Sequence, residues 1–185
     1  MMDKRYLINI AADAILEVLD SRHIIDQEQL LQKHPELSRH AATFVTLELN
    51  HSLRGCIGSL VARRTLLEDI ISNAKAAAFE DPRFAPLSRA EFDAPTFTIE
   101  VSLLSEPRQL HYESIEELYE RIRPGIDGVI LKYGAHQATY LPQVWEQLPR
   151  VEDFFASLCH KAQMQADCLH HYPEIYTYEV EKITK

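Results

Sequence analysis

The chain has 185 residues, of which 46% are hydrophobic, and its 19 basic and 28 acidic side chains give a formal net charge of −9. This composition excludes a disordered chain and fits one domain or two small lobes that share a core. No stretch gathers enough Lys and Arg to follow a phosphate backbone, so we expect no nucleic-acid partner.

The cysteines and the apolar segments bear on location. Three cysteines, at positions 56, 159 and 168, are an odd and sparse set that fits a reducing cytoplasm. Residues 1–5 lead into an amphipathic helix rather than a signal sequence, and no segment approaches the roughly 20 apolar residues that span a bilayer. We therefore expect a cytoplasmic protein without a membrane anchor.

The first part of the chain predicts two helices and a hairpin. Apolar residues recur with helical spacing over 3–20, and a shorter helix is expected over 26–34. Residues 43–49 alternate like a half-buried strand. Residues 50–52 fit a tight turn, because Asn tolerates positive φ, and they lead into a second strand at 53–58.

A further helix begins at Thr65, because Thr65 followed by Glu68 has the spacing of a capping box. It should end near 81–82, before an ordered loop at 83–87 that two prolines restrict. Alternation over 96–104 then predicts the clearest strand of the chain.

The remaining elements repeat this order. We expect a helix near 114–123, strands at 129–133 and 136–141, a helix at 152–165 and a last strand at 175–183. A hairpin followed by a helix thus occurs twice, which predicts a structural duplication. The expected fold is α+β, with two intimately packed lobes around antiparallel sheet and flanking helices. We expect one domain over 1–185, with lobes of about 1–105 and 106–185.

The candidate site lies in the run Leu53-Arg54-Gly55-Cys56-Ile57-Gly58. Successive side chains of a strand point to opposite faces, so Leu53 and Ile57 can face a core while Arg54 and Cys56 share the other face. A nearby guanidinium stabilises a thiolate. The run therefore predicts a thiol site with Cys56 as the reactive group and Arg54 as its activator.

Each residue of this run also has a purely structural interpretation. Cys56 could be a small packed side chain, and Arg54 could pair with Glu100 on a later strand, which would remove the activating charge. Gly55 and Gly58 either admit a ligand to the backbone or let a helix lie close. These alternatives stay open at this level.

Three more residues are candidates for ligand binding. Asp81 and Arg83 could form a polar wall of the same cleft, although Asp-Pro also commonly ends a helix. Trp145 could stack on a planar ligand or anchor a core. A basic patch around Arg54, Arg63 and Arg64 could hold one small anion.

No cofactor is predicted. The Cys and His residues near 159–160 and 168–171 match no zinc pattern, and the chain lacks a nucleophile elbow, a Walker loop and a dinucleotide-binding fingerprint. We therefore predict no metal site.

Three segments together resemble the AMMECR family, whose bacterial members are called AmmeMemoRadiSam system protein A. They are the 53–58 run, the sequence DPRF at 81–84 with Pro86-Leu87, and LPQVW at 141–145 after PGIDG at 124–128. The resemblance implies an α+β fold with two lobes. It also implies a shared pathway or complex with Memo-like proteins and radical S-adenosylmethionine proteins. One departure is Gln163, where the family usually has glycine near the end of the last long helix.

Two functions follow as hypotheses. The chain is either a small-molecule-binding or thiol-dependent enzyme component, acting on a small anionic metabolite or on a partner, or a noncatalytic adaptor for the partners that the resemblance implies. In the first case Arg54, Cys56, Glu100 and Asp81 line the cleft. In the second case the same strand shapes a contact surface.

Overall fold

The computed structural model describes residues 3–185. The contacts between residues divide the chain into two compact units. The first unit extends to Leu104 and includes residues 181–185 again at the end of the chain, and the second unit holds residues 105–180. The chain therefore passes between the units twice. The expectation that residues 1–185 form a single domain stays a prediction.

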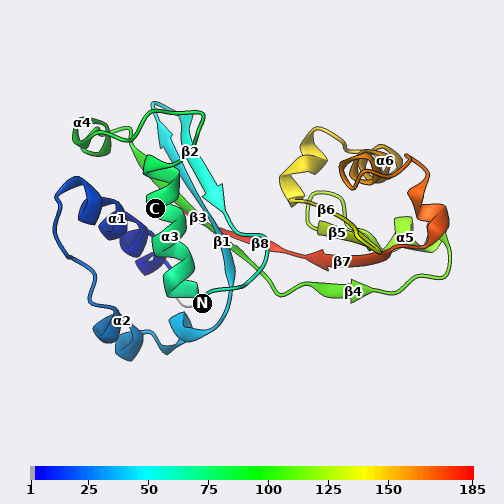
Figure 1. Cartoon of the computed structure of the whole chain (residues 1–185), viewed down its shortest axis with the longest axis horizontal. Coiled ribbons are helices and arrows are strands. Elements are labelled where there is room, and N and C mark those ends of the chain that lie inside the picture. Colours follow the sequence, from blue (N-terminus) through cyan, green and yellow to red (C-terminus); the bar gives the residue numbers. More distant parts are fainter. Residues whose placement is uncertain (1–2) are drawn as a thin grey trace. The chain divides into compact units, whose positions relative to one another are not determined.

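The first unit contains a four-stranded antiparallel sheet in the order β2-β1-β3-β8, so that β2 is an edge strand (Figure 1). In chain order its elements are α1 (Tyr6–Leu19), α2 (Gln27–Lys33), a 3-10 turn (Pro35–Ser38), β1 (Ala42–Leu49), β2 (Ser52–Gly58), α3 (Leu66–Phe79), α4 (Arg89–Phe92), β3 (Thr98–Leu104) and β8 (Val180–Ile183).

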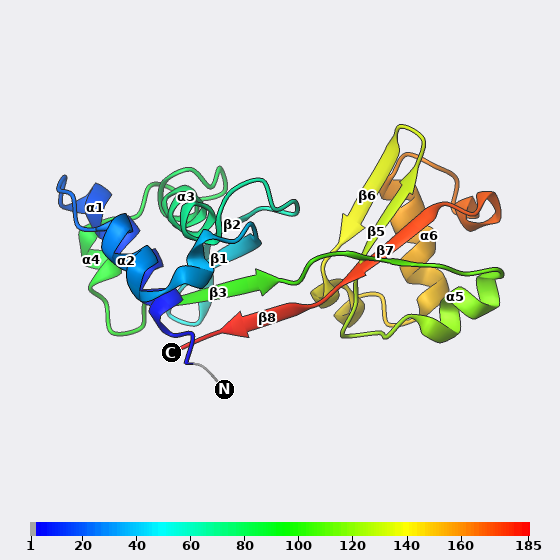
Figure 2. The ribbon, with the colours of Figure 1, turned by 90° about the horizontal axis from the view of Figure 1, so that it is seen from below.

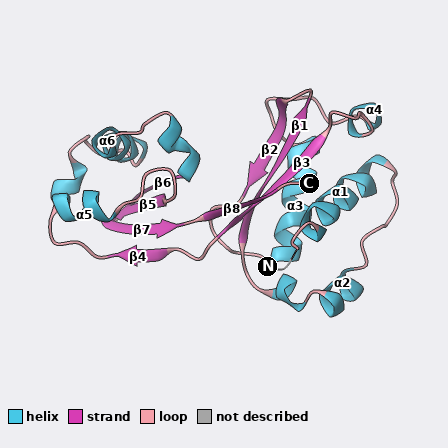
Figure 3. Ribbon diagram, turned by 180° about the vertical axis from the view of Figure 1, so that it is seen from behind, coloured by secondary structure: helices cyan, strands magenta, loops and turns pink. Residues whose placement is uncertain are grey.

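The core of the first unit lies between this sheet and the helices α1 and α3, which run side by side along it (Figure 3). Val45 and Leu47 of β1 point into the core and are fully buried, as their alternation predicts. The start of α3 is confirmed, because Thr65 and Glu68 form a complete capping box. Burial of this apolar face thus fixes which side of the sheet remains for a functional site.

The turn between β1 and β2 is the expected tight hairpin. Asn50 and His51 both have positive φ, at 53° and 62°, the pattern of a type I′ turn. This turn and the β1/β2 pairing fix the register, in which Thr46 lies directly opposite Cys56.

The second unit has its own antiparallel sheet, in the order β4-β7-β5-β6, with α5 and α6 packed against it (Figure 2). Its elements are β4 (Arg108–Leu110), α5 (Ile115–Arg121), β5 (Gly128–Tyr133), β6 (His136–Tyr140), a 3-10 turn (Pro142–Glu146), α6 (Val151–Lys161), a second 3-10 turn (Cys168–His171) and β7 (Glu174–Tyr178). The sequence did not predict β4, which is too short to show a period, and the expected last strand is divided between β7 and β8.

The α+β class and the repeated hairpin and helix are confirmed. The sequence of elements β1, β2, α3 in the first unit recurs as β5, β6, α6 in the second. No helix within residues 3–185 combines the length and the apolar character that crossing a membrane requires.

A disulfide joins Cys159 of α6 to Cys168 in the following 3-10 turn, and both residues are fully buried. The sequence analysis did not predict this bond. In the structure the two Cα atoms lie 5.8 Å apart, within the range of a disulfide. The spacing of the cysteines in the sequence does not reveal this distance. Cys56 is the free cysteine of residues 3–185.

Helix α6 ends four residues before its predicted end at 165. Gln163 has φ of 61°, and the Met164 amide donates to the Cys159 carbonyl oxygen at 2.9 Å, which is the long hydrogen bond of a Schellman motif. Gln163 thus occupies the left-handed position that glycine adopts most easily. The position at which this sequence departs from the family's usual glycine is therefore the position that ends the helix.

We predict that Gln163→Gly stabilises the protein by about 1 kcal/mol, because glycine adopts the left-handed conformation without the steric cost that a side chain brings. Urea unfolding measures the free energy of unfolding. The matched control is Ala162→Gly, where φ is −77° and glycine brings no such gain. Equal effects of both substitutions would contradict the interpretation.

Candidate functional site

We call β2 the motif strand, because it contains the run Leu53–Gly58. Its two faces have different surroundings. Gly55 points toward α3, and Cys56 points to the opposite face, where its side chain meets Thr46 of β1. The β1/β2 register shifts between the pairs Leu47–Gly55 and Glu48–Leu53, so Arg54 has no partner on β1. That Arg54 shares a face with Cys56 stays a prediction. Leu53 does not reach the core as expected, because it is 42% exposed next to the hairpin turn.

Both glycines of the motif strand are required by packing within the chain. A Cβ atom at Gly55 would lie 2.1 Å from the carbonyl oxygen of Ala77 in α3, so the helix backbone occupies that space. A Cβ atom at Gly58 would lie 2.2 Å from Cγ of Phe44, whose ring covers the glycine from the neighbouring strand. Close approach of a helix and of a ring, rather than of a ligand, accounts for the two residues.

Arg54 pairs with Glu91, not with Glu100. Its Nε donates to Glu91 Oε1 at 2.8 Å, and its Nη2 donates to Glu91 Oε2 at 3.1 Å and to the Ala85 carbonyl oxygen at 2.8 Å. The Arg54 side chain is only 11% exposed. This guanidinium, followed by hydrogen bonds from Ser88, lowers the pKa of Glu91 to about 2.

The prediction that Arg54 pairs with Glu100 is wrong, because it assumed a different strand order. Strand β1 lies between β2 and β3, so Glu100 faces Thr46 and is separated from Arg54 by a whole strand. Glu100 instead lies 3.7 Å from the Lys182 ammonium of β8. Across the sheet, Cys56, Thr46 and Glu100 thus form one row.

Glu91 was missed by the sequence analysis, although a local signal for it exists. Ser88 and Glu91 have capping-box spacing, and the box is complete at the start of α4. The carboxylate of Glu91 therefore caps this short helix and binds Arg54 at the same time. Only the capping role can be read from the sequence, because the second role depends on how the loop passes along β2.

Asp81 and Arg83 form what we call the edge clamp, which holds the outer edge of the motif strand at Cys56. Asp81 Oδ2 accepts the Cys56 backbone N–H at 3.0 Å, and Arg83 Nη2 donates to the Cys56 carbonyl oxygen at 3.4 Å. Arg83 also donates to both carboxylate oxygens of Asp81, from Nε to Oδ1 at 3.0 Å and from Nη2 to Oδ2 at 2.7 Å. The clamp thus satisfies backbone groups that an edge strand leaves unpaired.

The charge on Asp81 is stabilised within this clamp. Asp81 is 4% exposed, and its pKa is held well below the usual range, first by the Arg83 guanidinium and then by the Cys56 and Arg83 amides, against the opposing effect of burial. The Arg54 and Arg83 guanidinium groups also lie 5.7 and 5.5 Å from the ring centre of Phe84. Asp81 and Arg83 therefore lie beside Cys56 as expected, but as a mutually neutralised pair.

The Cys56 thiol remains half-buried on this face. Its Sγ lies 3.3 Å from the hydroxyl oxygen of Thr46. Because the backbone N–H and C=O of Cys56 point out toward the clamp, Cys56 and Thr46 form the closer, non-hydrogen-bonded type of cross-strand pair. The side chain is thus fixed in place without being sealed in aliphatic interior.

The expected basic patch for a small anion does not form. Arg54 is neutralised by Glu91, and Arg64 lies against buried Asp69, with its Nε donating to Oδ1 at 3.0 Å. Arg63 alone is left exposed. A single exposed guanidinium does not make an anion site.

Trp145 does not line a ligand site. It is 3% exposed, its ring stacks on Phe154 at 3.6 Å in the core of the second unit, and its Nε1 donates to the Asp127 carbonyl oxygen. The interpretation as a core anchor is therefore correct. Within residues 3–185 no three His, Cys, Asp or Glu side chains are arranged to hold a metal ion.

Comparison with known proteins gives one consistent result. The AMMECR1 family model matches residues 8–183. A protein of Thermofilum pendens is 36% identical over 180 residues, covering 89% of this chain and 81% of its own length. A protein of Sulfurisphaera tokodaii is 39% identical over 175 residues, covering 89% and 74%. The crystal structure of an uncharacterised protein from Pyrococcus horikoshii superposes with a TM-score of 0.79 and 31% identity, covering 98% of this chain and 92% of that one.

We predict that Asp81→Asn lowers the free energy of unfolding by about 2 kcal/mol at pH 7, because the clamp loses charge-assisted hydrogen bonds at a buried position. The pKa of Asp81 is lower in the folded than in the unfolded chain, so its contribution is present above about pH 4. It is lost as the pH falls through the folded pKa. The difference between wild type and variant should therefore shrink on acidification.

Urea unfolding between pH 7 and pH 2 measures this dependence. Asp93→Asn serves as control, because Asp93 forms only an exposed pair with Arg89 and should change stability by less than about 0.5 kcal/mol. A pH-independent difference between wild type and Asp81→Asn would show that the Asp81 charge does not stabilise the fold.

Proposed function

The chain belongs to the AMMECR1 family, and we propose that it is a binding component whose motif strand presents the Cys56 thiol to a small molecule or a partner protein. The observation that carries the proposal is the half-buried thiol on the sheet face turned away from α1 and α3, with the edge clamp fixing its backbone. The relatives compared above are uncharacterised, so the proposal rests on the geometry of this chain.

Packing accounts for most of the motif strand but not for its sulfur. Gly55 leaves space for α3, and Gly58 leaves space for the Phe44 ring. Arg54 binds Glu91 and thereby holds the loop that contains it. The thiol of Cys56 contacts only the hydroxyl of Thr46 among the hydrogen-bonding groups of residues 3–185. A serine or alanine would fit the same space, so a sulfur atom here is better explained by interaction with something outside the chain.

Binding is favoured over catalysis by the state of the neighbouring charges. A thiol nucleophile needs a cation or a base directed at it. Arg54 is bound by Glu91 and Arg83 by Asp81, each through two of its nitrogen atoms. These pairs leave no net positive charge at this position, so we propose a ligand or partner that contacts the thiol without carrying a negative charge.

For partners we propose the Memo-like and radical S-adenosylmethionine proteins, on the resemblance of the motif segments alone. A noncatalytic adaptor is the second candidate function. The ion pairs of Arg54 and Arg83 favour it, because each guanidinium charge is balanced by a carboxylate, although Arg54 Nη1 is buried without a hydrogen-bond partner among the described residues. In both cases the motif strand is the contact surface.

We also propose a cytoplasmic location, on the small number of cysteines in the sequence. The Cys159–Cys168 disulfide argues for a less reducing compartment, because disulfides are rare in a reducing cytoplasm. Its redox state in the cell therefore tests this part of the proposal.

We predict that iodoacetamide labels Cys56, and neither Cys159 nor Cys168, in native protein that has not been reduced. Peptide mass spectrometry assigns the labelled residue, and Cys56→Ser is the control that should abolish labelling. Labelling of Cys56 only on complete unfolding would mean that the thiol is sealed, and the binding proposal would fail. Alkylation of freshly opened cells in denaturant exposes all three cysteines and so reports in addition whether the disulfide exists there. Labelling of all three cysteines under these conditions would support the cytoplasm.

The choice between the two functions depends on capture of partners from the cell in which the protein is made. We expect a tagged chain to retain a Memo-like or radical S-adenosylmethionine protein, and alkylation of Cys56 to reduce that retention because it adds bulk to the contact face. Retention by Cys56→Ala would favour the adaptor. The adaptor fails if nothing is retained while Cys56→Ala abolishes function in the cell.

A further inference from the structure

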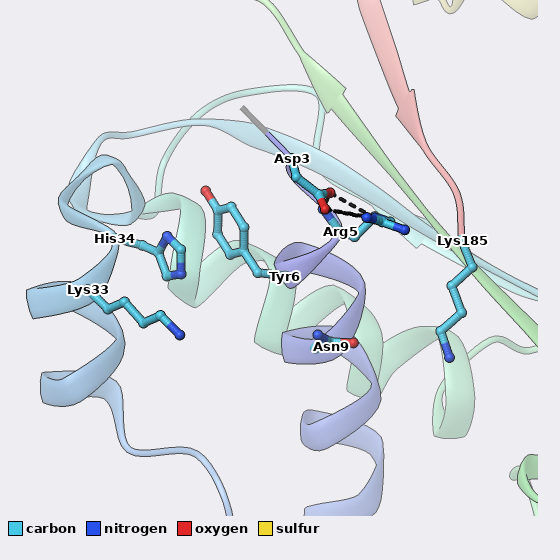
Figure 4. A pocket seen from close by; sticks show the side chains of 7 residues that line it. All are labelled: Asp3, Arg5, Tyr6, Asn9, Lys33, His34 and Lys185. Atoms are coloured by element: carbon cyan, nitrogen blue, oxygen red, sulfur yellow. Dashed lines mark hydrogen bonds and ion pairs between the residues drawn. The ribbon is translucent and has the colours of Figure 1, made fainter. Parts of the chain in front are cut away.

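A second feature of the first unit is a hollow at the start of α1 and the end of α2, which we call the basic pocket (Figure 4). Its volume is about 610 Å³, within the size range of small-molecule sites. It shares no residue with the motif strand or the edge clamp. The lining consists of Asp3, Arg5, Tyr6, Asn9, Lys33, His34 and Lys185.

One wall of the basic pocket is an aromatic pair. The rings of Tyr6 and His34 stack with their centres 3.8 Å apart and their planes within 5°. Glu36 fixes this pair, because its Oε1 accepts the Tyr6 hydroxyl at 2.5 Å and lies 3.4 Å from His34 Nδ1. Burial, and then the Glu36 carboxylate, raise the pKa of Tyr6, so the hydroxyl stays protonated and continues to donate. Each ring thus covers one face of the other, and the pair is fixed in position.

The upper rim in Figure 4 is a guanidinium held in one orientation. Asp3 accepts from Arg5 Nε at 2.9 Å and from Arg5 Nη2 at 2.6 Å, and it also accepts the Arg5 backbone amide at 3.0 Å. This arrangement uses one side of the planar guanidinium and leaves the Nη1 side free of hydrogen bonds within residues 3–185. Asp3 balances the charge of Arg5, as Asp81 balances that of Arg83, and the exposed Nη1 side of Arg5 can still donate to a further acceptor.

Two ammonium groups of the basic pocket are unpaired. No hydrogen bond or ion pair links the Lys33 or Lys185 side chain to another residue of the described range 3–185. In Figure 4 these side chains extend from opposite sides of the pocket, with the Asn9 amide between them in that view. The lining therefore contains three cations against the single carboxylate of Asp3, in a chain whose net charge is −9.

Cations that line one hollow attract an anion more strongly than the same charges spread over a flat surface. The pocket offers two ammonium groups, the free side of the Arg5 guanidinium and an amide beside a stacked aromatic pair. We propose that the basic pocket binds a small organic dianion with a planar apolar part. Its negative group, a phosphate monoester or a pair of carboxylates, lies among Arg5, Lys33 and Lys185, and its planar part lies against Tyr6 and His34.

The test is isothermal titration calorimetry of the whole chain with phenyl phosphate, at low and at high NaCl concentration. We expect saturable binding that weakens about tenfold in the double variant Lys33→Gln/Lys185→Gln, because two exposed charge contacts are lost. Binding should also weaken as salt screens these contacts. The matched control is Lys132→Gln/Lys161→Gln, which removes the same charge in the second unit, where these side chains lie over Tyr176 and Tyr140.

Three further ligands separate the parts of the proposal. Phthalate replaces the phosphate by two carboxylates, and the tighter of the two dianions identifies the preferred group. Phenol lacks the charge and should not bind, and inorganic phosphate lacks the ring and should bind more weakly than phenyl phosphate. The proposal is overturned if no dianion binds at millimolar concentration, if phenol binds as well as phenyl phosphate, if inorganic phosphate binds equally well, or if both double variants behave alike.

Discussion

The structure of the candidate site depends on the edge clamp, the ion pair of Asp81 and Arg83 that binds the backbone of Cys56. An edge strand has backbone groups with no neighbouring strand to bond them. Here Asp81 accepts the amide and Arg83 donates to the carbonyl group, so the loop after α3 takes the place of a missing strand. The clamp also restricts Cys56 to one position beside Thr46. The DPRF sequence and the motif strand, which are separated by 22 residues of the chain, therefore form one structural unit.

The distribution of charge separates the two surfaces of the first unit. Around the motif strand each cation that could activate the thiol is bound by a carboxylate, Arg54 by Glu91 and Arg83 by Asp81. In the basic pocket Lys33 remains without such a partner among the described residues. The first surface is rigid and neutral, which suits a contact through the thiol. The second is positive in an acidic chain, which suits a small anion.

What the sequence could predict depends on the range of the interaction. The capping box at Thr65 and the opposite directions of Gly55 and Cys56 are local patterns, and both are found in the structure. The partner of Arg54 is not local. Glu100 was expected on an adjacent strand, but strand order places it two strands away, and Glu91 reaches Arg54 only through the path of a loop. Alternation and spacing contain no information on strand order or loop path, so the face of the site was predictable and its ion pairs were not.

The most direct test of the clamp is amide hydrogen exchange at Cys56 in the native protein, compared between wild type and Asp81→Asn. The account predicts a protected Cys56 amide in the wild type and a large loss of protection in the variant. The amides of Gly55 and Ile57, which point toward β1, should stay protected in both. A Cys56 amide that exchanges in the wild type as fast as an unbonded surface amide would contradict the account.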